Sequence, residues 1–251
     1  MLSLTPQRLK EFLSSGRELW SEFKELERQF KEMTDYISLR EDHHPVYSKN
    51  VGKFLVDTGA HCDNTFRVMY DYCSEVSGEV RKRKPNIKKY RQRIEPFYAL
   101  SAKRVDVRYH DQRGVLGDYG NPIQPFASFV ASSVRNQTPV WWRAYNKVKH
   151  DRFNKHQDGT LKNAVEALSG AFLLNVMHIP TRMVIAVEGA IRYGLFTNDP
   201  YFHTFQNGTR MLNGILEPKF QIRKEDDKEL YVSCIWAESE FFSVPLHVPA
   251  L

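Results

Sequence analysis

The segment VWWRAYNKVKH, residues 140–150, carries four polar side chains at the spacing of one helix face. This polar stripe consists of Arg143, Asn146, Lys147 and His150. At about 100° per residue, apolar side chains gather on the other side of the same helix. They are Trp141, Ala144, Tyr145 and Val148. The sequence therefore predicts a helix that buries one face and projects an arginine and a histidine, two turns or about 10 Å apart, from the other.

The residue types of the polar stripe suit metal-free cleavage of RNA. Histidine titrates near neutrality, so His150 could deprotonate a ribose 2′-hydroxyl or protonate the leaving oxygen. Arginine stays charged, and the planar guanidinium of Arg143 could stabilise the charge of a phosphorane-like transition state. Asn146 and Lys147 could position the phosphate. Because one chain supplies one stripe histidine, we expect a homodimer that brings two stripes together, with one imidazole as base and the other as acid.

The alternative interpretation of the stripe is a solvated amphipathic face with ordinary salt bridges. Trp142 and Phe153 border the stripe, and two such rings would be unusual in water. We therefore expect a second helix or a partner chain to pack against them. Lys149 and Arg152 lie beside the stripe and are further candidates for binding phosphate or RNA.

A separate basic block covers residues 81–113, where twelve lysines and arginines face three acidic residues, a local charge of +9 in a chain of net charge +6. Its candidates for RNA binding are Lys88, Lys89, Arg91 and Arg93. Tyr90, Phe97 and Tyr98 are interleaved with them, and aromatic rings beside cations suit single-stranded RNA. Such a block favours an anionic partner such as nucleic acid or phosphate. A solvated loop with counter-charges folded against it, or plain helix packing, explains the same pattern.

The pair Arg143-x6-His150 resembles the R-x4–6-H signature of the HEPN superfamily. The segments YNKVKHDR and GTLKNAVEALSGAFLL resemble the motif region of prokaryotic HEPN-like proteins, and the similarity extends over roughly Pro139 to His178. Proteins of this superfamily are small all-α bundles and often dimers. Many are metal-independent ribonucleases of toxin–antitoxin, phage-defence and RNA-processing systems, and others have lost catalysis and only bind.

The resemblance implies an endoribonuclease of a prokaryotic defence or toxin–antitoxin type, without a metal or other cofactor. It implies Arg143 and His150 as catalytic residues, a homodimer, and an antitoxin-like protein as a partner. Ala144 stands where catalytic members have a polar residue directly after the arginine, and Asn146, one turn after Arg143, would take that place. The alternative is a non-catalytic HEPN-like module that binds RNA, a nucleotide or a partner protein.

Cysteines and apolar runs indicate the compartment. Cys62, Cys73 and Cys234 form no CxxC pair and suggest no disulfide framework, as expected in a reducing cytosol. The N-terminus lacks the apolar region of a secretory signal, and the most continuous apolar run, Ala171–Met177, is too short to span a bilayer. We therefore expect a cytoplasmic protein with no membrane partner.

Two further sets of residues do not belong to the candidate site. Asp57 and His61 are four residues apart, a spacing that can hold one metal on a helix face. No HExxH motif or Cys/His cluster accompanies them, so a metalloprotein is the weaker hypothesis. His178, just before Ile179 and Pro180, is expected in the last turn of a helix, where a cation suits the helix dipole.

Apolar residues at alternating spacings of three and four predict two long helices. The first begins at Thr5 and continues to Ile37, and the second follows a cap at Ser48 and continues to Cys73. Joined by the short break at Arg40–Pro45, they predict an antiparallel hairpin. The basic block then interrupts the helical pattern.

The remaining elements complete a mainly α fold. Further helices are predicted over about residues 125–135, from the Thr138–Pro139 start signal to residue 153, over 160–178 and over 181–193. Alternation with period two predicts a short strand at 105–109 and a hairpin of 220–222 with 230–236, joined by 242–244. The predicted architecture is a HEPN-like helical bundle in residues 1–212, built on the long antiparallel helical hairpin. Residues 213–251 form a small appendage with a C-terminal β hairpin, packed on the bundle.

Overall fold

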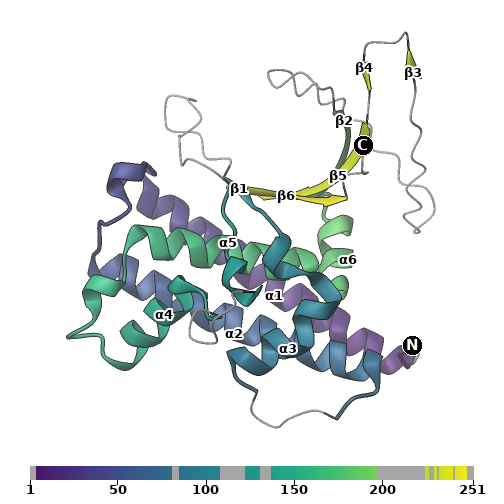
Figure 1. Cartoon of the computed structure of the whole chain (residues 1–251), viewed down its shortest axis with the longest axis horizontal. Coiled ribbons are helices and arrows are strands. Elements are labelled where there is room, and N and C mark those ends of the chain that lie inside the picture. The colour runs from purple at the N-terminus through teal and green to yellow at the C-terminus, as the bar shows by residue number, and fades with distance from the viewer. Residues whose placement is uncertain are drawn as a thin grey trace.

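The structure is a computed structural model that describes residues 4–80, 85–107, 122–130, 137–196, 224–225, 229–230, 232–239 and 241–247. In these residues the chain is mainly α, as predicted, with strands on one side of a helical bundle (Figure 1). The α-helices are α1 (Pro6–Thr34), α2 (Lys49–Ser77), α3 (Ile87–Tyr98), α4 (Val140–His150), α5 (Leu161–Met177) and α6 (Ile179–Val187). Short 3-10 helices are η1 (Glu41–His43), η2 (Leu100–Ala102), η3 (Ala127–Val130) and η5 (His156–Asp158).

Helices α1 and α2 begin where the sequence predicts. The hydroxyl of Thr5 accepts a hydrogen bond from the Arg8 N–H at 3.3 Å, and this confirms the first cap. The hydroxyl of Ser48 accepts from the Val51 N–H at 3.2 Å, and this confirms the second. Helix α1 ends at Thr34, slightly before the last apolar residue of the predicted seam.

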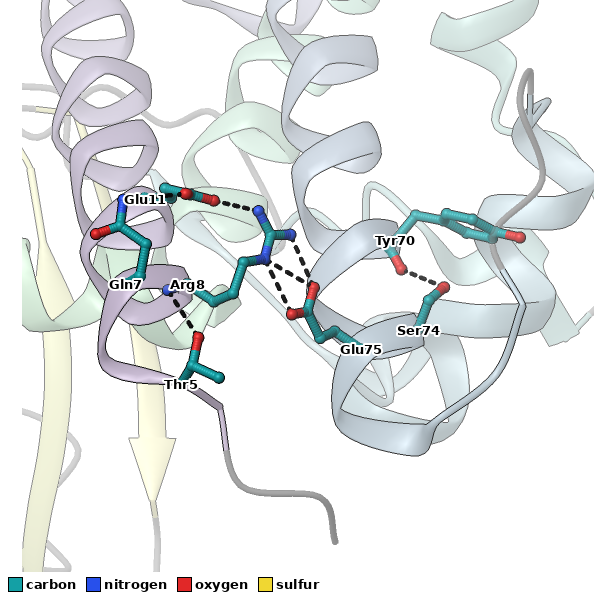
Figure 2. A network of polar contacts seen from close by, with 7 residues as sticks. All are labelled: Thr5, Gln7, Arg8, Glu11, Tyr70, Ser74 and Glu75. Carbon is teal, nitrogen blue, oxygen red and sulfur yellow. Dashed lines mark hydrogen bonds and ion pairs between the residues drawn. The ribbon is translucent and has the colours of Figure 1, made fainter.

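Contacts at both ends of the hairpin show that α1 and α2 run antiparallel. Near the start of α1, the Arg8 guanidinium donates from Nε at 2.9 Å and from Nη2 at 2.7 Å to the Glu75 carboxylate near the end of α2 (Figure 2). Glu11 forms an ion pair with the same guanidinium. Near the other end, Phe30 packs on Phe54 with ring centroids 5.4 Å apart. The predicted hairpin is therefore confirmed, and a bidentate ion pair joins the start of α1 to the end of α2.

Helix α5 forms the centre of the bundle and packs on α1, α2, α4 and α6. Thr160 caps it as predicted, with its hydroxyl accepting from the Asn163 N–H at 3.3 Å. Every residue from Ala167 to Met177 is buried, and this explains why the helix is apolar on all sides. Among the described residues, no helix alone has the length and apolar character needed to cross a membrane. Helices α5 and α6 would meet that requirement only together, and they are bent by 90°.

Residues 87–98 form α3, although the sequence predicts an interruption of the helical pattern there. The Asn86 side chain caps this helix by accepting from the Lys89 N–H at 3.2 Å. Three side chains at intervals of four residues bury one face against α2. They are Tyr90, Ile94 and Tyr98. The prediction is wrong because this narrow apolar stripe of α3, packed on α2, is enough to hold a helix whose other positions are mostly charged.

The helix predicted over about residues 125–135 is wrong where the structure describes it, because only the short η3 forms. Phe126 and Phe129, three residues apart, both pack on the Phe66 ring of α2, at 5.6 and 6.3 Å. A 3-10 turn places residues i and i+3 on one face, so it satisfies both contacts without a longer helix. Residues 131–136 lie outside the described part of the chain.

The helix predicted over residues 181–193 is wrong in its second half. Helix α6 ends at Val187, and Gly189 takes a φ of 77°, in the left-handed region that favours glycine. The chain then continues as strand β2 (Ile191–Phe196). The β-branched side chain of Ile191 suits a pleated sheet.

The described strands form one antiparallel sheet and one short hairpin. The sheet has the order β1 (Asp106–Val107), β6 (Phe242–His247), β5 (Val232–Glu238) and β2. The hairpin pairs β3 (Lys224–Glu225) with β4 (Glu229–Leu230). The predicted strand at 105–109 corresponds to β1, and the one at 230–236 falls in β4 and β5. The predicted strand at 220–222 and residue 109 lie outside the described residues.

The sheet joins segments from both sides of the predicted division between residues 212 and 213, a point that lies outside the described residues. Strands β1 and β2 precede it, and β5 and β6 follow it. Phe241 is buried against Phe30 of α1, with ring centroids 5.4 Å apart. Phe242 is buried against Phe172 of α5, at 5.8 Å. The C-terminal strands therefore share the core of the bundle.

Candidate functional site

Helix α4 buries its apolar face against α2 and α5. The four predicted core residues are each at most 4% exposed. They are Trp141, Ala144, Tyr145 and Val148. Close packing depends on Gly59 of α2, where a Cβ atom would lie 2.4 Å from carbon atoms of the Tyr145 ring. The predicted core face of this helix is therefore confirmed, and it fixes which face is left to solvent.

The start signal predicted at Thr138 and Pro139 is displaced by one residue. Pro139 occupies the N-cap position, and no side chain there accepts from the first-turn N–H groups. The first turn is held instead by the Trp141 indole N–H, which donates to the Pro125 carbonyl at 2.9 Å. At the other end, three basic side chains in the last turn suit the negative end of the helix dipole.

The two aromatic residues that border the stripe have different surroundings. Trp142 is 7% exposed, and the Phe66 ring of α2 packs edge-on against it at 5.7 Å. The second helix expected there is therefore α2 of the same chain, and Trp142 needs no partner chain. Phe153 lies beyond the end of α4 and is 93% exposed. The expectation that a neighbouring helix of this chain covers it is wrong.

The polar stripe lies on the solvent side of α4. Arg143, Lys147 and His150 are exposed, and Asn146 is half-buried. The side chains of Arg143 and His150 form no hydrogen bond or ion pair with any residue that the structure describes. The guanidinium and the imidazole therefore belong to one accessible flank of the helix, at the two-turn spacing of about 10 Å.

Asn146 and Lys147 are partly engaged by the protein itself. Asn146 donates from Nδ2 to the Trp142 carbonyl at 2.8 Å, which leaves its carbonyl oxygen and its second N–H for a ligand. Lys147 forms an ion pair with Asp158 of η5 at 2.9 Å. The Lys147 side chain is 55% exposed, so an anion can compete for it at small cost.

The stripe of one chain is incomplete as a catalytic centre. In histidine-dependent catalysis a second group orients the imidazole, and a second proton carrier acts on the leaving oxygen. His150 has no orienting contact among the described residues, and each chain has one stripe histidine. A second copy of the stripe, or the RNA itself, would have to supply the missing contacts.

Two of the four candidate cations of α3 are tied into the fold. Arg91 donates from Nη1 to the Phe129 carbonyl at 2.8 Å. Arg93 forms an ion pair with Glu79 at 2.5 Å, and its guanidinium lies 5.6 Å from the centre of the Tyr70 ring. Only 13% of the Arg93 side chain is exposed. Both arginines join α3 to neighbouring elements, so their surroundings give no support to a role in RNA binding.

The two lysines of α3 are more accessible but lie away from the end of the stripe. Lys88 is exposed, and Lys89 donates from Nζ to the Gln92 side chain at 3.2 Å. Tyr90 of α3 packs on Phe66 and Tyr70 of α2, whereas the end of α4 reaches α2 around Gly52. Phe66 and Gly52 are about 21 Å apart along the α2 axis. The structure therefore does not bring the α3 lysines together with the C-terminal end of the stripe, although Trp142, beside Arg143, packs on the same Phe66 ring.

Lys149 and Arg152 flank the stripe, and they differ in whether the protein itself binds their charged groups. Lys149 donates from Nζ to the Tyr145 hydroxyl at 2.9 Å and lies 5.1 Å from the centre of that ring. The hydrogen bond to Tyr145 raises the pKa of Lys149, which therefore stays charged. Arg152 is exposed and forms no hydrogen bond or ion pair with the described residues. Of the two, Arg152 is the one that remains open to an anion.

A cleft of about 490 Å³ opens beside the first turn of α4. Glu166 of α5 lines it, and burial raises the pKa of that carboxyl. His44 lines it too, and burial lowers the pKa of that imidazole. The Ser128 hydroxyl is buried at this wall and has no hydrogen-bond partner among the described residues. Titratable groups shifted in opposite directions within one cleft are a recurrent property of functional sites.

Sequence reasoning missed this cleft because its walls come from four separate parts of the chain. They are the α1–α2 connection, the segment around η3, the start of α4 and the exposed side of α5. No spacing pattern links these parts, so no sequence signal could have found them. The cleft adjoins the stripe, since Val140 lines it and stands one turn before Arg143.

His61 is held by protein groups at both ring nitrogens. Nδ1 lies 3.1 Å from Oε2 of Glu22, and Nε2 lies 3.0 Å from Nδ2 of Asn175. Among the described residues, no group of three or more His, Cys, Asp or Glu side chains could hold a metal ion. The hypothesis of a metal at Asp57 and His61 therefore gains no support from this part of the structure.

The expectation of a cationic His178 is wrong. This residue is fully buried at the junction of α5 and α6, with Nδ1 hydrogen-bonded to the Thr181 hydroxyl at 2.8 Å. Burial, together with the charge of Arg182, lowers the pKa of His178 to about 3, so the imidazole is neutral. Arg182 supplies the charge at the end of α5 by donating to the carbonyls of Val176 and Met177, at 2.8 and 3.0 Å.

The two cysteines whose side chains are described belong to the core. Cys62 and Cys73 are free thiols and fully buried. Burial raises the pKa of both thiols, that of Cys73 to about 12. They therefore stay protonated and fill space as small apolar side chains.

The geometry narrows the candidate site to one flank of α4. Arg143 and His150 are open on it, Arg152 stands beyond its end, and the cations of α3 lie elsewhere. No family model, curated protein or solved structure matches this chain. The chemistry of this flank is therefore the basis on which a function can be inferred.

Proposed function

We propose that this protein is a metal-independent endoribonuclease of HEPN type that acts as a homodimer in a prokaryotic cytosol. Its setting would be a defence or toxin–antitoxin type system with an antitoxin-like partner. Arg143 and His150 would carry catalysis, and Asn146 and Lys147 would position the phosphate. The observation that carries the proposal is the shared exposure of Arg143 and His150 on one flank of α4, without a partner among the described residues. Ordinary salt bridges account for Lys147, which pairs with Asp158, but not for these two.

The proposed reaction is a transesterification. His150 of one copy takes the proton of a ribose 2′-hydroxyl, the 2′-oxygen attacks the adjacent phosphorus, and the bond to the 5′-oxygen breaks. His150 of the second copy gives a proton to that oxygen. Arg143 stabilises the charge that develops on the phosphate. The products are a 2′,3′-cyclic phosphate and a 5′-hydroxyl, and the step needs no metal.

A second candidate function is a non-catalytic module that binds RNA, a nucleotide or a partner protein through the same flank. Two observations favour it. No described residue orients His150. Ala144, which stands where catalytic HEPN members have a polar residue, is 4% exposed and faces the core, so its side chain cannot reach a substrate.

Incubation of the full chain with single-stranded RNA in the presence of EDTA tests the proposal. We expect cleavage that survives chelation and leaves 2′,3′-cyclic phosphate ends. His150→Ala should lower the rate roughly 10²- to 10⁴-fold, the usual contribution of a general acid or base. Because the flank is open to solvent, free imidazole should restore part of the lost activity in that variant.

Arg28→Ala serves as the matched control for changes of charge. Arg28 is exposed on α1, where it pairs with Glu25 and Glu32, so its loss should leave cleavage unchanged. If the wild-type chain cleaves no RNA, and His150→Ala binds RNA as tightly as the wild type, the enzyme is excluded and the binding module is favoured.

A further inference from the structure

A short turn follows α4 and is held by its own side chains. The Asp151 carboxylate accepts from the Asn154 N–H at 3.3 Å and from its Nδ2 at 3.0 Å. The Asp151 carbonyl accepts from the Lys155 N–H at 2.9 Å. His156 Nδ1 is hydrogen-bonded to the Phe153 carbonyl at 3.1 Å. All these bonds are local, so the turn keeps its shape without a partner.

Phe153 forms the tip of this turn, and its backbone carbonyl is hydrogen-bonded to His156, which contacts a second exposed ring. Its side chain is 93% exposed. The ring of His156 lies 5.5 Å from that of Tyr47, which is itself 50% exposed. Tyr47 is joined to Thr160 by an antiparallel bridge, so the α1–α2 and α4–α5 connections meet here. Both connections lie at the end of the bundle opposite the N-terminus (Figure 1), and each contributes one ring to the Tyr47–His156 contact.

The charges around Phe153 favour an anion. Arg152 and Lys155 are exposed on either side of it in sequence. The acidic groups of the same connection are engaged, since Asp151 holds the turn and Asp158 pairs with a lysine of α4 at 2.9 Å. An apolar partner surface would have to desolvate the free cations, which is costly. A polyanion that carries planar groups fits the rings and the cations together.

We propose that this turn is a stacking platform for single-stranded RNA. Phe153 stacks on an unpaired base, and Arg152 and Lys155 contact the neighbouring phosphates. The turn starts directly after His150, so a strand held by it passes beside the polar stripe. The inference deepens the proposed function by naming unpaired RNA as the substrate class, and it rests on that function only for what happens to the RNA after binding.

Fluorescence anisotropy with single-stranded RNA of about ten nucleotides tests the platform. The His150→Ala background keeps the RNA intact. In that background Phe153→Ala should weaken binding roughly 5- to 150-fold, the loss of one stacked base, while Phe153→Trp should retain the affinity. The matched control is Phe97→Ala, because Phe97 is 46% exposed on α3 and lies outside both connections, and this change should leave the affinity unaltered.

Salt dependence separates the stacking part of the proposal from the electrostatic part. Arg152→Ala should reduce the slope of log affinity against log salt concentration by about 1, as expected for one lost phosphate contact. Phe153→Ala should leave that slope unchanged, because it removes no charge. A duplex of the same sequence should bind more weakly and should be insensitive to Phe153→Ala.

The outcomes distinguish this inference from the proposed enzyme. Equal affinity of the parent and Phe153→Ala chains, or no RNA binding by the wild type, would overturn the platform even if RNA is cleaved. If Phe153→Ala instead converts a dimer into a monomer in sedimentation without weakening RNA binding, Phe153 is a contact between copies and the platform is again overturned. Loss of binding in Phe153→Ala, with no cleavage by the wild type, would keep the platform and refute the enzyme.

Discussion

Helices α3 and α4 carry similar residues and use them in opposite ways. Both pack an aromatic ring on Phe66 of α2, Tyr90 from α3 at 5.4 Å and Trp142 from α4 at 5.7 Å. On α3 the two arginines bond back to the protein. On α4, Arg143 and His150 meet no described partner. The density of cations along a sequence therefore does not show which of them are open to a ligand, whereas the position of their acceptors does.

The acceptors that occupy α3 come from elements outside it. One is the carbonyl of Phe129 in η3, and the other is the carboxylate of Glu79, just beyond α2. Among the residues that the structure describes, the outer flank of α4 forms one ion pair, between Lys147 and Asp158 of η5. A basic side chain that meets an acceptor on a neighbouring element therefore stabilises the fold. A basic side chain without such an acceptor among the described residues can bind a ligand instead.

The substitution with the largest expected effect on stability disturbs the packing of α4 on α2. Gly59→Ala would place a methyl carbon 2.4 Å from the Tyr145 ring, so α4 must move away from α2. We expect the free energy of unfolding to fall by about 3 kcal/mol, the upper part of the range for an overpacked core. Urea titration followed by circular dichroism measures this loss.

Gly52→Ala is the control for that substitution, on the same helix and against the same partner. A Cβ atom there would lie 3.7 Å from Val148, an ordinary van der Waals contact. Because alanine favours a helix over glycine by about 1 kcal/mol, stability should stay the same or rise. Equal effects of the two alanines would contradict the described packing of α4 on α2.

The second test concerns a buried histidine, in contrast to the exposed histidine on α4. His178 has its pKa lowered from 6.5 to about 3 in the folded chain. Between these values the unfolded chain binds a proton that the folded chain does not, so stability is full above pH 6.5 and falls as the pH drops. The loss can reach about 1.4 kcal/mol per pH unit.

His178→Gln isolates this effect, even if glutamine also costs stability at neutral pH. We expect the difference between the urea midpoints at pH 7 and pH 5 to be smaller in the variant than in the wild type. The same difference in both chains would show that the imidazole at the α5–α6 junction is not held neutral.

The third test concerns an arginine that the fold uses. Arg93→Ala removes the ion pair with Glu79 and the contact with the Tyr70 ring. We expect the free energy of unfolding to fall by about 1 kcal/mol, measured by urea titration. RNA affinity should not change, and a large loss of affinity would place α3 within the RNA site.

The smallest effect on stability is expected for the arginine that the fold does not use. Arg143→Ala should change the free energy of unfolding by less than about 0.5 kcal/mol, because Arg143 has no partner among the described residues. RNA cleavage should nevertheless fall roughly 10²- to 10³-fold. If Arg143→Ala costs as much stability as Arg93→Ala, the contrast between the two helices fails.

Local signals were enough to predict much of the fold. The caps at Thr5, Ser48 and Thr160 act within their own first turns, so the sequence shows them directly. The core and solvent faces of α4 follow from helical spacing in the same way. The open flank with Arg143 and His150 could be placed for this reason.

The features that escaped prediction depend on distant neighbours. Helix α3 forms because α2 receives Tyr90, and η3 stays short because Phe66 contacts both Phe129 and Phe126, which directly precedes η3. The neutral state of His178 follows from burial between two helices, which spacing alone does not reveal. The cleft that contains Glu166 is assembled from four segments. None of these features can be predicted before the tertiary arrangement is known.

The order of the sheet has a consequence for aggregation. Strand β5 lies between β6 and β2, and β6 pairs with β1, so both earlier strands depend on C-terminal partners. A chain cut after residue 212 would leave two bare backbone edges, and Phe172 would lose the ring of Phe242 that covers it. Bare edges recruit strands from other molecules. We therefore expect a bundle without the C-terminal strands to aggregate more readily than the full chain.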